Sequence, residues 1–167
     1  MPNIIYIHGL GSSGQGFKAQ LLRKVLPGCL TPDFKKYSDT TSHKKLLEER
    51  MAQLISILRE KKSWVIISSS FGGLMGALYT CQFPEKVMRL ILLAPALAFP
   101  ILNLTRFSPV NVPVIVFHGK FDKIIPIKQT RALAKQLFTN LTYNIVDDDH
   151  LLHSTVKRID WHTIVKK

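Results

Sequence analysis

The chain has 167 residues, 46% hydrophobic and 20% charged, enough apolar material for the core of one domain spanning residues 1–167. Its formal net charge is +12, but the basic residues are spread along the chain, which argues against a nucleic-acid-binding module. No apolar run approaches the roughly 20 residues of a membrane-spanning helix. Residues 1–7 lack the basic cluster and long apolar run of a secretion signal. We therefore expect a soluble, cytoplasmic protein.

Apolar runs and turn residues predict strands that alternate with helices along the chain. In chain order the predicted elements are a strand at 3–8, a helix at 17–26, a weak strand at 29–31, a helix at 42–62, a strand at 64–68, a helix at 72–81, strands at 87–93 and 112–118, a helix at 126–138, a strand at 141–146 and a helix at 151–165. Strands without polar alternation are typical of a sheet covered on both faces. The sequence thus predicts a three-layer α/β/α sandwich with a mainly parallel sheet of about six strands.

The loop after the first predicted strand allows two interpretations. Its residues 9–14 match the G-x-G-x-x-G pattern of dinucleotide-binding proteins, and Asp33 lies near the position of the ribose-binding acid. However, Gly16 prolongs the loop, so the helix begins only near Phe17 and its N-terminus would not meet a phosphate. No second domain remains for a reducible substrate. The favoured alternative is a glycine turn that offers the backbone N–H of Leu10 to an oxyanion.

The segment from Ser68 to Gly73 lies between a buried strand and a helix, which is the setting of a nucleophile elbow. Such a turn exposes one hydroxyl, here that of Ser70, and requires small residues two positions before and after it. Gly72 fits the later position, whereas Ser68 stands where glycine is usual. The N–H of Phe71, at the start of the helix, is the second expected oxyanion donor. A serine- and glycine-rich loop that merely caps the helix is the alternative.

A serine nucleophile needs a histidine base and a carboxylate that orients it, and this architecture places them in the order Ser, acid, His. Asp122 falls in the turn after the strand at 112–118, and His150 follows the strand at 141–146. The carboxyl ends of parallel strands share one edge, so we expect both near Ser70. The competing candidates are His153 as base, residues 147–149 as acid, and a helix-capping role for Asp122.

Four motifs together resemble the α/β-hydrolase superfamily, in particular its small, lidless bacterial esterases of the YqiA-like group. They are His8-Gly9-Leu10-Gly11, Ser68-x-Ser70-x-Gly72, His118-Gly119-x-x-Asp122-x-x-Ile125-Pro126 and Asp149-His150. The resemblance implies Ser70 as nucleophile, Asp122 as acid, His150 as base, and the backbone N–H groups of Leu10 and Phe71 as the oxyanion hole. The short link from Ala94 to Val112 leaves no room for a lid domain.

The resulting hypothesis is a serine hydrolase that cleaves small-molecule carboxylic esters or thioesters through an acyl-enzyme. We expect no metal and no other cofactor, since Cys29 and Cys81 stand far apart without paired ligands at metal spacing. No nucleic-acid partner and no stable membrane insertion are expected. One alternative is a protein that keeps the fold but acts by binding a partner. A dinucleotide-binding protein is the other.

Overall fold

The structure, a computed structural model, describes residues 2–100 and 103–166. Its centre is a sheet of five parallel strands in which neighbours in space are also consecutive in the chain. These strands are β1 (Asn3–Ile7), β2 (Trp64–Ser69), β3 (Val87–Leu93), β4 (Val114–Gly119) and β5 (Leu141–Val146). Parallel neighbours need long connections, and here most of these connections contain helices.

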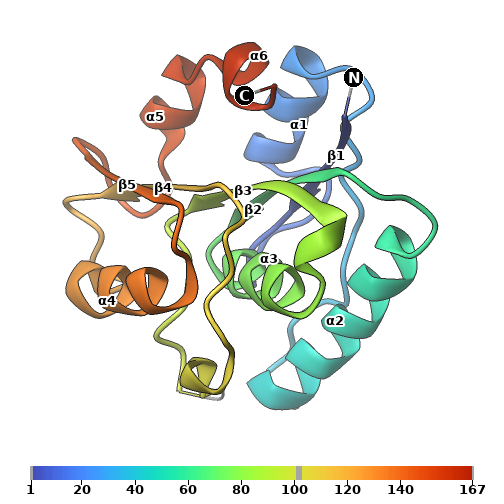
Figure 1. The fold of residues 1–167 in the computed structure, drawn as a ribbon, viewed down its shortest axis with the longest axis vertical. Coiled ribbons are helices and arrows are strands. Elements are labelled where there is room, and N and C mark those ends of the chain that lie inside the picture. Colours follow the sequence, from blue (N-terminus) through green and yellow to red (C-terminus); the bar gives the residue numbers. More distant parts are fainter. Residues whose placement is uncertain (1, 101–102, 167) are drawn as a thin grey trace.

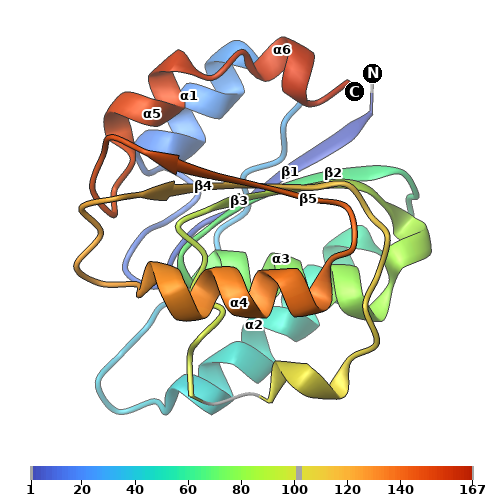
Figure 2. The same cartoon turned by 60° about the vertical axis from the view of Figure 1, so that its left-hand side comes forward.

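Helices cover both faces of the sheet, so the predicted three-layer sandwich is confirmed (Figures 1 and 2). On one face lie α1 (Phe17–Val25), α5 (His153–Arg158) and α6 (Trp161–Ile164). On the other face lie α2 (His43–Leu58), α3 (Phe71–Gln82) and α4 (Ile127–Leu137). Two short 3₁₀ turns, Pro84–Lys86 and Leu104–Arg106, complete the described elements. None of the helices within the described ranges is long and apolar enough to cross a membrane.

The core consists of two apolar clusters, one on each face of the sheet. Every residue of β2 is buried, because Ile66 faces one cluster while Val65 and Ile67 face the other. Full burial of an aliphatic side chain of this size contributes about 1.5–3 kcal/mol relative to exposure. The continuous apolar strands of the sequence therefore correspond to strands covered on both sides.

Two details differ from the prediction. In place of a strand at 29–31, Leu30 forms an isolated bridge beside β1: its N–H donates to Ile4 O at 2.9 Å, and Tyr6 N–H donates to Leu30 O at 2.8 Å. Pro32 lacks an N–H and cannot extend this pairing. The single helix predicted at 151–165 is wrong. It divides into α5 and α6, because Asp160 caps a new helix by accepting a hydrogen bond from Thr163 N at 3.2 Å.

Candidate active site

Ser70 lies on the sharp turn between β2 and α3. Its φ of 54° and ψ of −118° place it in a region that residues with a side chain rarely adopt. Such a conformation costs on the order of 1–3 kcal/mol and persists only where the surroundings enforce it. Here Ser70 N donates to Leu93 O at 3.0 Å, and Ser70 O accepts from Ala96 N at 2.9 Å. The turn therefore has the strained geometry of a nucleophile elbow.

Glycines on α3 allow this turn to close against the sheet. A Cβ at Gly72 would clash with the carbonyl oxygens of Ile7 and His8, so only glycine fits there. Ser68 is fully buried, and a Cβ at Gly76 would lie 2.5 Å from its Oγ. The serine that replaces the usual elbow glycine thus occupies space left free by Gly76.

The structure brings Ser70, His150 and Asp122 together at the carboxyl edge of the sheet. His150 Nε2 lies 3.2 Å from Ser70 Oγ, and His150 Nδ1 lies 2.7 Å from Asp122 Oδ2. With Nδ1 donating to the carboxylate, Nε2 is left as the acceptor for the serine hydroxyl. The side chain of His150 is 19% exposed while that of Asp122 is fully buried. The histidine is therefore open to a ligand on one side and held by a buried acid on the other.

Backbone N–H groups of the turn that follows Asp122 stabilise its side chain in the charged form. Its Oδ1 accepts hydrogen bonds from the N–H groups of Ile124 and Ile125, both at 2.8 Å. Burial raises the pKa of this carboxyl, but the hydrogen bonds from Ile125, His150 and Ile124 outweigh it, so the pKa lies below its ordinary value. Asp122 is thus charged at neutral pH, and it caps its own turn while it also contacts His150.

A second buried histidine, His118 on β4, also faces Asp122. Its Nε2 lies 3.2 Å from Asp122 Oδ2 and 3.2 Å from Ile125 O, so this nitrogen carries the hydrogen. Its Nδ1 lies 2.6 Å from the hydroxyl of Tyr143, which donates to it. Burial lowers the pKa of His118, which keeps the ring neutral. In the sequence, His118 stood out only as part of the motif around Asp122, and a histidine four residues before the acid was the available signal.

The competing candidates for acid and base are engaged elsewhere. Asp148 Oδ2 accepts from the N–H and the hydroxyl of Thr155, both at 2.8 Å, and so fixes the start of α5. Asp149 Oδ1 accepts from Leu151 N at 2.9 Å. His153 begins α5 and packs its ring on Phe17, with the centroids 4.2 Å apart.

The first loop lies beside Ser70. A Cβ at Gly9 would be 3.4 Å from Ser70 Cβ, so the backbone passes close to the hydroxyl. The N–H groups of Leu10 and Phe71 donate no hydrogen bond to any residue in the described part of the chain. Backbone N–H groups that lack a partner and lie next to a serine hydroxyl can form an oxyanion hole.

Arg50 of α2 binds two carbonyl groups of this loop, and the sequence patterns did not predict it. Its guanidinium is fully buried and donates to Gly9 O at 3.2 Å, Leu10 O at 3.1 Å and Lys35 O at 2.8 Å. Burial lowers its pKa to about 10, which leaves it charged at neutral pH. A charged residue on the apolar stripe of the predicted helix was the signal that could have revealed it.

The glycine pattern at 9–14 serves packing in this structure. Asp33, the candidate ribose ligand, accepts a hydrogen bond from Gly14 N at 2.7 Å. A Cβ at Gly14 would clash with the backbone of Thr31 and Pro32, so this glycine lets two loops touch. The helix starts at Phe17, as the prolonged loop predicted. These contacts argue against the dinucleotide interpretation.

The Ser70 hydroxyl opens into a cleft of about 650 Å³, which is the size of a small-molecule site. The cleft walls come from the first loop, the start of α1, the elbow and the loops after β3, β4 and β5, and include Leu10, Phe71, Phe99 and Leu151. Among the described residues, no group of three or more His, Cys, Asp or Glu side chains is placed to hold a metal ion.

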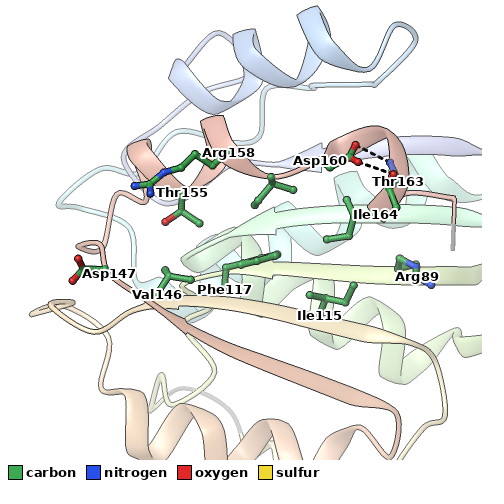
Figure 3. Close-up of a pocket in the computed structure, with 11 residues that line it drawn as sticks. Arg89, Ile115, Phe117, Val146, Asp147, Thr155, Arg158, Asp160, Thr163 and Ile164 are labelled. Carbon is green, nitrogen blue, oxygen red and sulfur yellow. Dashed lines mark hydrogen bonds between the residues drawn. The ribbon is translucent and has the colours of Figure 1, made fainter.

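A separate cavity of about 620 Å³ lies between the α5–α6 segment and the sheet (Figure 3). Ile115 and Phe117 of β4 line it, with Arg89 and Arg158 toward opposite ends (Figure 3). None of the Ser70, Asp122 and His150 side chains lines it, so it is separate from the cleft above the elbow.

Several solved structures share this fold. Est1E from Butyrivibrio proteoclasticus, solved with ferulic acid bound, has 17% sequence identity and a TM-score of 0.78, over 99% of this chain and 90% of that chain. A member of the alpha/beta hydrolase superfamily from Xanthomonas campestris has 23% identity and a TM-score of 0.74, over 93% and 91%. The monoacylglycerol lipase of Paleococcus ferrophilus has 19% identity and a TM-score of 0.70, over 99% and 94%. The fold is therefore that of the α/β hydrolases.

No curated protein matches the chain in amino-acid sequence. A family model matches residues 3–114, which include the first loop, Arg50 and Ser70 but end before Asp122 and His150. With that match over most of its length, the chain belongs to the uncharacterised protein family UPF0227.

Proposed function

We propose that the protein is a serine hydrolase that cleaves small-molecule carboxylic esters or thioesters through an acyl-enzyme intermediate. The observation that carries this proposal is the pair of hydrogen bonds at His150, 3.2 Å to Ser70 Oγ and 2.7 Å to Asp122 Oδ2. A serine hydroxyl alone is a weak nucleophile, and this arrangement gives it a base with a fixed tautomer. Capping or packing alone does not require such a chain of contacts.

In the first half-reaction, Ser70 Oγ bonds to the carbonyl carbon while His150 Nε2 takes the hydroxyl proton. The negative charge on the carbonyl oxygen accepts hydrogen bonds from the Leu10 and Phe71 N–H groups. When the tetrahedral intermediate collapses, His150 gives its proton to the departing alcohol or thiol and the acyl group stays on Ser70. Asp122 remains ionised throughout and stabilises the imidazolium of His150.

In the second half-reaction, water replaces the leaving group. His150 accepts a proton from the water as its oxygen bonds to the acyl carbon, and the same oxyanion donors act again. Return of that proton to Ser70 Oγ releases the carboxylic acid and the free enzyme. All groups needed for this cycle are supplied by the chain.

Two further features of the structure and one comparison support the proposal. Arg50 fixes the carbonyl oxygens of Gly9 and Leu10, which orients the first loop toward the reacting centre. The described link between β3 and β4 contains only a 3₁₀ turn, so the cleft has no lid domain there. The monoacylglycerol lipase of similar fold acts, by its name, on an acyl ester.

A fluorophosphonate probe tests the proposal, because it reacts only with an activated serine. We expect labelling of the wild-type protein at Ser70, loss of labelling in Ser70→Ala, and full labelling in the exposed-serine control Ser38→Ala. Hydrolysis of 4-nitrophenyl esters of graded chain length should follow the same pattern. A folded wild-type protein that is neither labelled nor active would favour the alternative, a binding protein that keeps the fold.

A further inference from the structure

The cleft above Ser70 is lined mainly by apolar side chains, with one charged side chain among its described residues. Most of its lining is apolar or aromatic, with Leu10, Phe17, Phe71, Phe99 and Leu151 among the contributors. Among the described residues that line it, Lys18 is the only one with a permanent charge, and no aspartate or glutamate is present. A single cation in an apolar cleft selects for a ligand with a matching anion.

Lys18 belongs to the first turn of α1, next to Phe17, and is half-buried. Its ammonium forms neither a hydrogen bond nor an ion pair with any residue in the described ranges. Burial lowers the pKa of Lys18, while Asp148 and Asp149 oppose this effect. An ammonium that has lost part of its hydration without gaining a partner is energetically costly.

The two nearby aspartates do not complete this site. Asp148 Oδ2 accepts two hydrogen bonds from Thr155, and Asp149 Oδ1 accepts one from Leu151 N. Neither carboxylate lies within ion-pair distance of the Lys18 ammonium. The three N–H donors of Lys18 are therefore free for a bound molecule.

We propose that Lys18 binds a carboxylate of the substrate, so that this hydrolase prefers esters or thioesters that carry a carboxylate away from the scissile carbonyl. This inference rests on the proposed function, because it concerns the same cleft. A charge-assisted hydrogen bond to a partly desolvated ammonium is stronger than a neutral one. The carboxylate would also restore the interactions that Lys18 loses on burial.

Two pairs of chromogenic esters locate this carboxylate. The acyl pair is the 4-nitrophenyl monoester of adipate and 4-nitrophenyl hexanoate, which have chains of equal length ending in a carboxylate or a methyl group. The leaving-group pair is the hexanoate ester of 5-hydroxy-2-nitrobenzoate and the hexanoate ester of 4-nitrophenol. In each pair the ratio of kcat/KM, anionic over neutral, is compared between variants, which cancels the intrinsic reactivity of the esters.

Three variants isolate the role of Lys18. Lys18→Met removes the charge and keeps a long flexible chain, and Lys18→Arg keeps the charge. Lys24→Met makes the same change of net charge at an exposed position of the same helix. We expect Lys18→Met to lower the ratio about tenfold or more in one of the two pairs. Lys18→Arg should keep most of the wild-type ratio, and Lys24→Met should keep all of it.

The pair that responds shows whether the carboxylate lies on the acyl or the leaving-group side. Unchanged ratios in Lys18→Met for both pairs would overturn the inference while hydrolysis of the neutral esters still supported the proposed function. An equal loss in Lys24→Met would also overturn it, since the general positive field would then explain the preference. A wild-type protein that hydrolyses none of the four esters would overturn both proposals.

Discussion

Asp122 Oδ2 faces two histidines, with His150 Nδ1 at 2.7 Å and His118 Nε2 at 3.2 Å. The first histidine is partly exposed and the second is fully buried, so the carboxylate is held between the cleft and the core. Because Tyr143 donates to the other nitrogen of His118, the tautomer of that buried ring is fixed as well. We therefore expect His118 to be a positioning residue that acts through Asp122.

The first prediction concerns this contact. His118→Leu removes a donor to Asp122 and leaves the Tyr143 hydroxyl without its acceptor, so we expect a loss of about 1–3 kcal/mol in the free energy of unfolding. We also expect kcat to fall about tenfold, because the carboxylate is less well held. His118→Gln offers an N–H at a similar position and should recover much of kcat. Urea unfolding and ester hydrolysis measure both effects, and a wild-type kcat in His118→Leu would contradict the assigned role.

The second prediction separates the acid from its neighbours in sequence. Asp122→Asn should keep the fold but lower kcat by about 10⁴, because the amide favours the wrong imidazole tautomer and cannot stabilise the imidazolium. Asp148→Asn is the matched control. It weakens the contacts with Thr155 at the start of α5, so its unfolding free energy should fall by about 1 kcal/mol with little change in kcat. The reverse pattern would place the acid in the aspartate run.

The third prediction concerns the support of the first loop. Arg50→Met leaves the carbonyl oxygens of Gly9, Leu10 and Lys35 without their donor, which should cost about 1–3 kcal/mol of stability. Since the loop carries the Leu10 N–H, kcat should fall more than KM rises. Arg59→Met removes an exposed arginine at the end of α2 and should change neither. Stopped-time assays over a range of ester concentrations separate kcat from KM, and an unchanged kcat in Arg50→Met would contradict this role.

The fourth prediction concerns pH. Burial lowers the pKa values of His8 and His118 below 6.5, so the folded chain binds fewer protons than the unfolded chain just below that pH. The free energy of unfolding is therefore highest above about pH 6.5 and decreases as the pH falls. The Tm should drop between pH 7.5 and pH 5.5, with a shallower drop in His118→Gln. Parallel slopes for the two proteins would show that His118 does not contribute. The carboxyl of Asp122 titrates below this window and has no part in it.

The spatial grouping of the candidate site residues could be predicted because it depends on local patterns at strand ends. Ser70, Asp122 and His150 each follow an apolar run that reads as a strand, and parallel strands present their carboxyl ends at one edge. The separation of 80 residues between Ser70 and His150 does not affect this placement, because both follow parallel strands. Chain order and strand direction were sufficient.

The supporting residues could not be predicted in the same way. Arg50 donates to carbonyl groups 40 residues away, and that pairing depends on how α2 packs on the first loop. The break between α5 and α6 also escaped the periodic pattern, because the capping contact of Asp160 competes locally with continuation of the helix. Contacts of this kind are decided by tertiary packing, which hydrophobic spacing does not encode.

Ser68 and Gly76 share one small volume beneath the elbow, so the residue types at the two positions should depend on each other as the sequences of related chains change. With serine at 68, the Cβ of an alanine at 76 would clash with the serine side chain. With glycine at 68, the same alanine would lose this clash and meet only Leu90 Cδ1, at 3.3 Å, so relatives of this chain should exchange the two sizes as a pair. A Ser68→Gly, Gly76→Ala double variant should accordingly be more stable than Gly76→Ala alone. A motif search that requires glycine two residues before the nucleophilic serine would therefore miss every chain that, like this one, has serine at that position and glycine at the position of Gly76.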